Sequence, residues 1–282
     1  MAQFSNADIA RYYDLSKTHY NKMWDLQRSK SLHYGIWDET TNNFHEALLN
    51  TNKVLAAMAG VTETDCLLDA GCGVGGSSLW LAKNIGCKAT GISLSADQVA
   101  SASSSSKHAS LSHLAKFEVN DFCHTGYPSQ SFSVVWAVES VCHAHDKSDF
   151  IKEAYRLLKP GGKLIMADFF KAEHLEGADA ALIKRWANGW AIDDFSTYTN
   201  FCALLQNEGF AILHQQDATS NIYKSARRLY FAYFPGAIGA FIYKLFHKKA
   251  TEFGKRNVDT ALLQYRALTK HLWSYRLICA VK

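Results

Sequence analysis

The sequence predicts an α/β fold in which helices flank a mostly parallel sheet. From Cys66 onward, short apolar segments of strand-like composition alternate with helical segments, which is the pattern of βαβ units. The apolar segment 66–69 runs into a glycine-rich turn, and a helix opens directly behind it. Proline and paired glycines at 160–162 end a later helix before the next strand. Together these observations predict one seven-stranded sheet.

The elements follow in order along the chain. The predicted strands are 66–69, 88–93, 115–120, 132–137, 162–168, 211–216 and 275–281. The predicted helices are 43–58, 77–83, 96–108, 147–158, 173–190 and 193–209, with Gly209 as the C-cap of the last. We expect 1–60 to form an N-terminal helical cap, 61–170 the core, and 171–282 a helical insertion or lid plus the final strands. These parts form one integrated domain.

Composition excludes several classes of protein. The formal net charge of +4 is too small to favour nucleic acid as a partner. The seven cysteines form no C-x-x-C pair, which argues against a zinc site or a disulfide framework and favours a reducing, cytoplasmic location. Residues 1–11 lack a signal-peptide pattern. The longest apolar run, 231–243, is too short to span a bilayer.

The glycine-rich turn predicts a ligand site. The segment 69–75 reads DAGCGVG and carries Asp69, Gly71, Gly73 and Gly75. Glycine lets a ligand lie against bare backbone, and the following helix N-terminus offers free N–H groups. Such a turn at the carboxyl end of a strand suits a nucleotide-type ligand. The alternative is a tight turn without a ligand.

The turn and the segments behind it resemble motif I of class I S-adenosylmethionine (SAM) dependent methyltransferases. The pattern D-x-G-x-G-x-G differs from the dinucleotide fingerprint G-x-G-x-x-G. This resemblance implies a Rossmann-like fold, SAM as cofactor and S-adenosylhomocysteine as product. It also implies that the four residues of the turn hold the methionine part of SAM.

The segment 91–98, GISLSADQ, resembles the GIxLSxxQ form of sterol, tocopherol and sugar O-methyltransferases and of cyclopropane synthases. The acidic residue that binds the ribose in many such enzymes is replaced here by Ser93. The resemblance implies that Ser93 and Gln98 hold the ribose and its surroundings, and that Leu94 also lies at the cofactor. The alternative makes Ser95 a helix N-cap with Gln98 in its first turn, and both can hold together.

The next strand ends at the segment Asn120-Asp121-Phe122. The resemblance implies that Asp121 accepts a hydrogen bond from the adenine amino group and that Phe122 lies beside the ring. An Asx turn at the strand end is the alternative.

The segment 136–143, WAVESVCH, resembles W-x-x-E-S-x-x-H of the tocopherol and sugar O-methyltransferases. Glu139 is expected at the cofactor, and His143 beyond it as a general base. Asp168 ends the fifth predicted strand and would orient His143 or bind the acceptor. The alternatives are a structural histidine and a strand-end turn residue. His143 and His145 lack an evident third ligand, so no metal is expected.

Aromatic and basic residues supply candidate walls for an acceptor, although core packing is the alternative. The segment 32–37, LHYGIW, resembles an LHYGxW element that lies over the cofactor pocket in the same group. Lys244 and the basic residues 247–249 flank the apolar run 231–243, which suggests peripheral membrane contact. The candidate substrate-binding residues are His33, Tyr34, Trp37, Trp186, Trp190, Tyr223 and Arg227.

The sequence therefore predicts a SAM-dependent methyltransferase acting on a small hydrophobic or aromatic acceptor of natural-product, quinol or isoprenoid type. Transfer to oxygen or to carbon stays open at this point. The alternatives are a C-methyltransferase of a sterol-like alkene, a cyclopropane synthase, and a SAM-binding sensor or partner subunit without enzymatic activity. We expect a monomer or homodimer.

Overall fold

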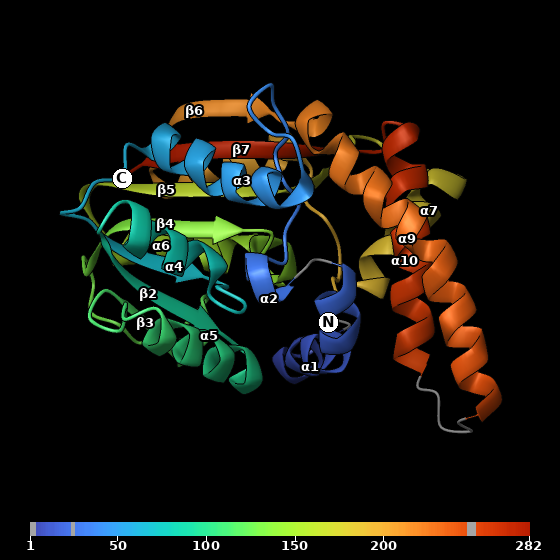
Figure 1. Cartoon of the computed structure of the whole chain (residues 1–282). Helices are drawn as coiled ribbons and strands as arrows, with labels where there is room; N and C mark the ends of the chain where they lie inside the picture. The colour runs from blue at the N-terminus through green and yellow to red at the C-terminus, as the bar shows by residue number, and fades with distance from the viewer. Residues whose placement is uncertain (1–3, 24–25, 247–251) are drawn as a thin grey trace.

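A seven-stranded sheet with the order β3-β2-β1-β4-β5-β7-β6 lies at the centre of the molecule (Figure 1). The computed structural model describes residues 4–23, 26–246 and 252–282, without the side chains of 16–23, 27, 234–246 and 252–258. Strand β7 runs antiparallel to both of its neighbours, and the other strand pairs are parallel. The strands are β1 (Cys66–Ala70), β2 (Lys88–Ser93), β3 (Ala115–Val119), β4 (Phe132–Val138), β5 (Leu158–Lys171), β6 (Ala211–Asp217) and β7 (Trp273–Val281).

The predicted fold class is confirmed, and each predicted strand is present. The main difference is β5, which starts at Leu158 and not at Gly162. Leu158 already pairs with Phe132 of β4, and the register then shifts before Lys163 pairs with Val134. The proline and glycines therefore make an irregularity within the strand, where a turn before it was expected.

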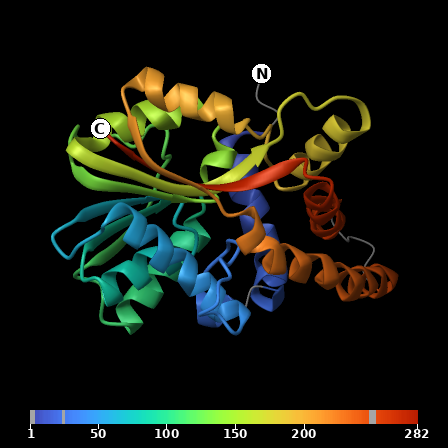
Figure 2. The same cartoon turned by 90° about the horizontal axis from the view of Figure 1, so that it is seen from above.

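Helices cover both faces of the sheet (Figure 2). In β1, Leu67 and Leu68 belong to two different hydrophobic clusters, because successive side chains of a strand point to opposite faces. Helices α3 and α4 pack on the face of Leu67, and α6 and α8 on the face of Leu68. Helix α5 runs along β2 and β3. Their bounds are α3 (Phe44–Ala59), α4 (Gly76–Asn84), α5 (Ala96–His108), α6 (Lys147–Leu157) and α8 (Tyr198–Glu208).

The ends of α5 and α8 carry the capping residues that the sequence predicts. Ser95 Oγ accepts a hydrogen bond from the Gln98 N–H at the start of α5, so the N-cap alternative is confirmed. Gly209 has φ = 107° and ends α8, as predicted. This helix begins at Tyr198, later than the predicted residue 193, because Thr197 is held in an isolated bridge to Lys171 of β5.

The remaining helices gather at the carboxyl edge of the parallel strands. Helices α9 and α10 form an antiparallel pair that projects beyond the sheet, and α1 lies beside α2 (Figure 1). None of the helices in the described part of the chain is both long and apolar enough for a membrane crossing. The bounds are α1 (Asn6–Met23), α2 (Leu26–Ser29), α7 (Gly177–Gly189), α9 (Thr219–Phe246) and α10 (Glu252–Thr269), and a 3-10 turn, η1, spans Val141–His143.

Candidate functional site

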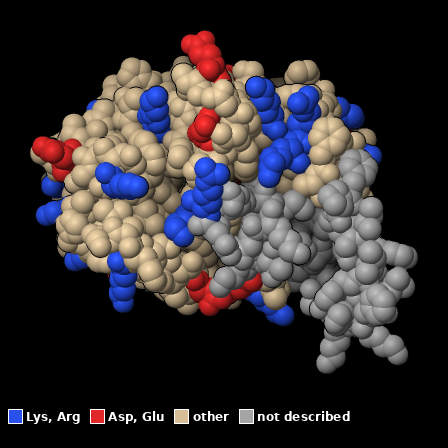
Figure 3. Space-filling view, viewed as in Figure 1, with Lys and Arg blue, Asp and Glu red and all other residues tan. Residues whose placement is uncertain are grey.

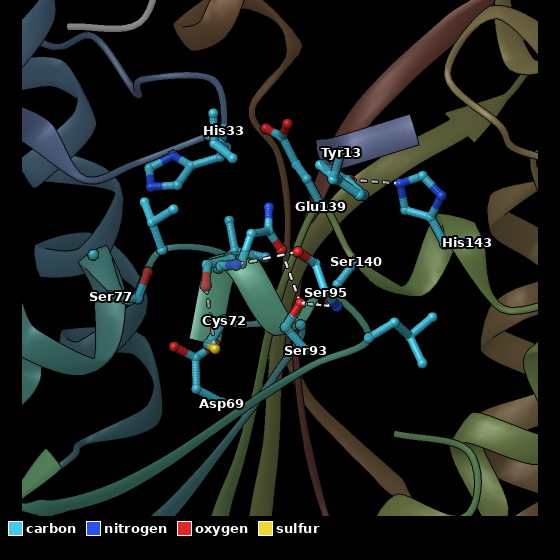
Figure 4. A pocket seen from close by; sticks show the side chains of 18 of the residues that line it. Tyr13, His33, Asp69, Cys72, Ser77, Ser93, Ser95, Glu139, Ser140 and His143 are labelled. Atoms are coloured by element: carbon cyan, nitrogen blue, oxygen red, sulfur yellow. Dashed lines mark hydrogen bonds between the residues drawn. The ribbon is translucent and has the colours of Figure 1, made fainter. Parts of the chain in front are cut away.

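A pocket opens at the carboxyl ends of β1, β2 and β4 (Figure 4). The strand order reverses between β1 and β4, and such a reversal leaves a crevice at the strand ends of an open α/β sheet. The pocket is lined by the glycine-rich loop after β1, the segments after β2 and β4, and residues 30–33. Helix α1 contributes Ile9, Ala10 and Tyr13. Segments far apart in the sequence thus meet at one site.

Two glycines of the loop are required by packing. Gly71 has φ = +94°, and a Cβ there would lie 2.4 Å from Ser140 Cβ. Gly75 has φ = +87°, and a Cβ there would lie 2.8 Å from the Phe117 ring. Both positions lie in the region that side chains rarely adopt, so they fix the path of the loop.

Gly73 leaves bare backbone facing the pocket. Its φ is +53°, and a Cβ would have only Leu32 and Gln98 within 4.0 Å, both of which line the pocket. The buried His33 also lines it, and His33 Nε2 has no hydrogen-bond partner among the described residues. His33 Nδ1 lies 2.9 Å from the Tyr34 carbonyl oxygen, to which it can donate, so Nε2 is then an acceptor. Open backbone and an unpaired acceptor fit the methionine part of SAM, whose ammonium donates hydrogen bonds.

The wall after β2 carries both polar and apolar side chains. Ser93 Oγ donates to Gln98 Oε1 at 2.8 Å, and both residues line the pocket with Leu94. Ser95 Oγ donates to Asp14 Oδ1 of α1 at 2.5 Å. The structure therefore brings Ser93, Leu94 and Gln98 together, where a ribose would find hydroxyl and amide partners.

The two residues predicted at the adenine lie in different environments. Phe122 lines the pocket. Asp121 does not line it, and its carboxylate accepts hydrogen bonds from Asn6 Nδ2 at 2.9 Å and from the Cys123 N–H at 2.8 Å. Asn6 of helix α1 thus contacts the carboxylate that the resemblance assigns to the adenine amino group.

Asp69 is the next-to-last residue of β1 and lines the pocket. Its Oδ2 accepts a hydrogen bond from Ser78 Oγ at 2.6 Å. Burial raises the pKa of Asp69 to about 6, and the bond from Ser78 only partly opposes the shift. The side chain ties the loop to the first turn of α4 as well as facing the ligand site.

Glu139 is held in a strained position directly after β4. Its φ is +51°, which is uncommon outside glycine and clusters at functional sites. Glu139 Oε1 accepts hydrogen bonds from the Tyr34 N–H at 2.7 Å and from the Tyr275 hydroxyl at 2.8 Å. Burial raises its pKa well above the usual value. Figure 4 shows Glu139 near both His33 and the pair of Tyr13 and His143.

His143 reaches the pocket from η1 and meets Tyr13 of α1. The Tyr13 hydroxyl lies 2.8 Å from His143 Nε2, and both side chains line the pocket. Burial lowers the pKa of His143 to about 4, so the ring is neutral near pH 7 and has one unprotonated nitrogen. Sequence reasoning placed His143 here but did not assign Tyr13, since no local signal links residues 130 positions apart.

Asp168 and Lys147 hold the η1 turn from two sides. Asp168 Oδ2 accepts from the Cys142 N–H at 2.9 Å, and Oδ1 accepts from the Phe169 N–H at 2.8 Å. Lys147 Nζ donates to the carbonyl oxygens of Cys142 at 2.8 Å and Ala144 at 2.5 Å. Asp168 thus supports the turn that carries His143, without lining the pocket itself. Lys147 is a second residue that the sequence did not reveal.

Most of the candidate acceptor residues lie outside the pocket. Tyr34, Trp186 and Trp190 belong to an aromatic cluster around Phe169, in which Trp186 is fully buried. For these three residues the structure therefore supports core packing, which was the alternative to a role in the acceptor wall. Of the seven candidates, only His33 lines the pocket.

The remaining candidates belong to the start of α9 and its contacts. The Trp37 indole N–H donates to Ser225 Oγ at 3.0 Å. Tyr223 pairs with the Tyr265 hydroxyl at 2.6 Å, and Arg227 is exposed. Lys244 and residues 247–249, proposed for membrane contact, lie outside the side chains that the structure describes.

The two histidines of the His-Ala-His segment point to different partners. His143 contacts Tyr13, whereas His145 Nδ1 lies 2.7 Å from Asp193 Oδ2. Within the described residues, no group of three His, Cys, Asp or Glu side chains could hold a metal ion.

Comparison with known proteins identifies the family. Residues 68–166 match a methyltransferase domain. The chain is 34% identical over 184 residues to 27-O-demethylrifamycin SV methyltransferase of Amycolatopsis mediterranei, covering 64% of this chain and 66% of that protein. It is 30% identical over 184 residues to the chloroplastic tocopherol O-methyltransferase of Arabidopsis thaliana, covering 61% and 52%. The matches thus span roughly half to two thirds of these relatives.

Solved structures share the fold over the whole chain. The cyclopropane synthase MmaA2 from Mycobacterium tuberculosis has a TM-score of 0.84 at 15% identity, with 99% of each chain covered. The [4+2]-cyclase SpnF has a TM-score of 0.77 at 24% identity, with 100% of this chain and 97% of that chain covered. The chain is therefore a class I methyltransferase in fold. It belongs to the SAM-dependent methyltransferases, whose cofactor is S-adenosylmethionine.

Proposed function

We propose that the protein transfers the methyl group of SAM to a hydroxyl of a small hydrophobic or aromatic acceptor. The observation that carries this proposal is the pairing of Tyr13 with His143 Nε2 at 2.8 Å in the wall of the pocket. A neutral histidine beside a hydroxyl provides a proton acceptor, and O-methylation of a phenol or alcohol needs one.

SAM supplies an electrophilic methyl group on a sulfonium sulfur, and the protein has to orient it and exclude water. Gly73, His33 and Glu139 would hold the methionine part, and Ser93 and Gln98 the ribose. Leu94 and Phe122 would pack against the adenine. These assignments rest on the position of each residue in the pocket and on the resemblance to the family.

The proton moves toward His143. The acceptor hydroxyl donates to Tyr13 Oη, and Tyr13 passes its own proton to His143 Nε2. Bound SAM would supply the methyl group that the acceptor oxygen takes, with S-adenosylhomocysteine as the uncharged leaving group, and the proton would end on the imidazole of His143. Lys147 and Asp168 act by holding the η1 turn.

A second candidate is C-methylation of an isoprenoid or sterol-like alkene. Sterol 24-C-methyltransferase erg-4 of Neurospora crassa is 30% identical over 219 residues, which supports it. Such a reaction develops a carbocation, which aromatic faces would stabilise. Trp186 and Trp190 are packed within the aromatic cluster and do not line the pocket, so we favour oxygen as the acceptor atom. Cyclopropanation also develops a carbocation and ranks lower for the same reason. A non-enzymatic SAM sensor ranks lower because the pocket wall carries a proton acceptor beside a hydroxyl.

The acceptor is the only partner that the proposal requires. The seven cysteines are all unpaired in the structure, which supports a reducing compartment such as the cytoplasm. Monomer and homodimer both remain compatible with the proposal.

The test is incubation of the purified protein with methyl-deuterated SAM and a metabolite extract, followed by mass spectrometry. We expect a product carrying the labelled methyl on oxygen, absent when His143→Ala replaces the wild type. A labelled methyl on carbon would favour the second candidate. SAM binding in calorimetry without any labelled product would favour the sensor.

A further inference from the structure

The first half of α9 presents an unusual exposed face. Among the described residues, Tyr223 and Phe231 are two of the few exposed large hydrophobic side chains, 39% and 59% accessible. At about 100° per residue, they share an arc of about 140° with three basic residues. The opposite side of the helix is buried, with Ile222, Ser225 and Ala226 inaccessible. The exposed face consists of Tyr223, Lys224, Arg227, Arg228 and Phe231.

Helix α9 carries charges of one sign only. The sequence of α9 contains four Lys and Arg and no Asp or Glu, so its formal charge of +4 equals that of the whole chain. Figure 3 shows basic side chains gathered over the start of α9. Lys224 Nζ lies 4.9 Å from the centre of the Trp37 ring. Lys224 and Arg227 form no ion pair within the described residues, so their charges are available to an anionic surface.

The buried side of α9 is tied to the cover of the pocket. Ser225 Oγ accepts from the Gly35 N–H at 3.1 Å and donates to the Gly35 carbonyl oxygen at 2.9 Å. Gly35 follows Tyr34, whose N–H donates to Glu139 in the pocket. The exposed face of α9 therefore lies one helix thickness from the segment that covers the site.

We infer that this face docks the protein on the surface of an anionic lipid membrane. Cations and aromatic rings on one helix face are the features of interfacial helices, in which the charges meet lipid headgroups and the rings enter the interface. The exposed Phe231 ring favours a lipid surface over an acidic protein, because a ring that protrudes among cations can insert between acyl chains. The inference rests on the proposed function, since a hydrophobic acceptor would be drawn from the same membrane.

The test is vesicle flotation of the full chain with phosphatidylcholine alone and with phosphatidylcholine mixed with phosphatidylglycerol. We expect binding to the mixed vesicles only, weakened by salt. Lys224→Gln/Arg227→Gln should lower the affinity about 30-fold, because each basic residue near an anionic lipid surface strengthens binding about fivefold. Phe231→Ala should weaken binding with all charges intact.

The matched control is Lys116→Gln/Lys159→Gln, which removes two exposed charges from β3 and β5, and it should bind like the wild type. Unfolding temperatures confirm that each variant is folded. Equal binding to both vesicle types, no binding to either, or equal loss in the two double variants would overturn the inference. SAM and acceptor are absent from this assay. A lack of vesicle binding would therefore overturn the membrane inference without bearing on the proposed methyl transfer.

Discussion

Substituting two glycines of the same loop by alanine should separate folding from cofactor binding. In Gly71→Ala, the new Cβ lies 2.4 Å from Ser140 Cβ at φ = +94°. Strained backbone costs about 1–3 kcal/mol, and overpacking a further 1–3 kcal/mol. We therefore expect a loss of stability of about 4 kcal/mol. In Gly73→Ala, the Cβ meets nothing closer than 3.9 Å at φ = +53°, and the cost is about 1 kcal/mol.

The assay combines thermal unfolding with calorimetric titration of SAM. The unfolding temperature should fall by about 10 °C in Gly71→Ala and by about 3 °C in Gly73→Ala. Gly73→Ala should nevertheless weaken SAM binding about tenfold or more, because its methyl group intrudes on the close approach to the backbone. Equal unfolding temperatures in the two variants, or unchanged SAM affinity in Gly73→Ala, would refute the roles assigned to these glycines.

Three further predictions concern the histidines and the η1 turn. His143→Ala should keep its SAM affinity and lose about 10²–10⁴-fold in turnover, measured with labelled SAM; equal loss of both would make His143 structural. Lys147→Met frees the Cys142 and Ala144 carbonyls and should lower kcat about tenfold or more with SAM affinity retained, whereas no change in kcat would remove Lys147 from the account. Burial lowers the pKa of His33 from 6.5 to about 4, so its contribution to stability is full above pH 6.5 and is lost as the pH falls toward 4. Denaturant titrations at a series of pH values should show that the free energy of unfolding falls by about 3 kcal/mol less in His33→Asn than in the wild type over this interval. If the free energy of unfolding depended on pH in the same way in both proteins, the lowered pKa of His33 would be contradicted.

The sheet was predictable because its signals are local. Leu67 and Leu68 fill opposite faces of β1, and an apolar strand followed by glycines identifies the position of the site. The reason for an individual glycine was not predictable. Bare backbone facing the ligand was expected at every position, but Gly71 is required by Ser140, which lies about 70 residues further along the chain.

The roles of the aromatic residues were harder to predict for a physical reason. A tryptophan on a helix suits a core and a ligand wall equally well, and only tertiary packing shows that Trp186 is buried against Phe195 and Trp273. The contact between Tyr13 and His143 joins the N-terminal helix to a turn after β4. Such long-range pairs leave no periodic pattern in the sequence.

The most direct test of the central claim is a crystal structure of the protein with S-adenosylhomocysteine. We expect the ligand to lie against Gly73, its adenine to pack by Leu94 and Phe122, and its sulfur to face Tyr13 and His143. A ligand bound outside this pocket, or one whose sulfur points away from the Tyr13–His143 pair, would contradict the account.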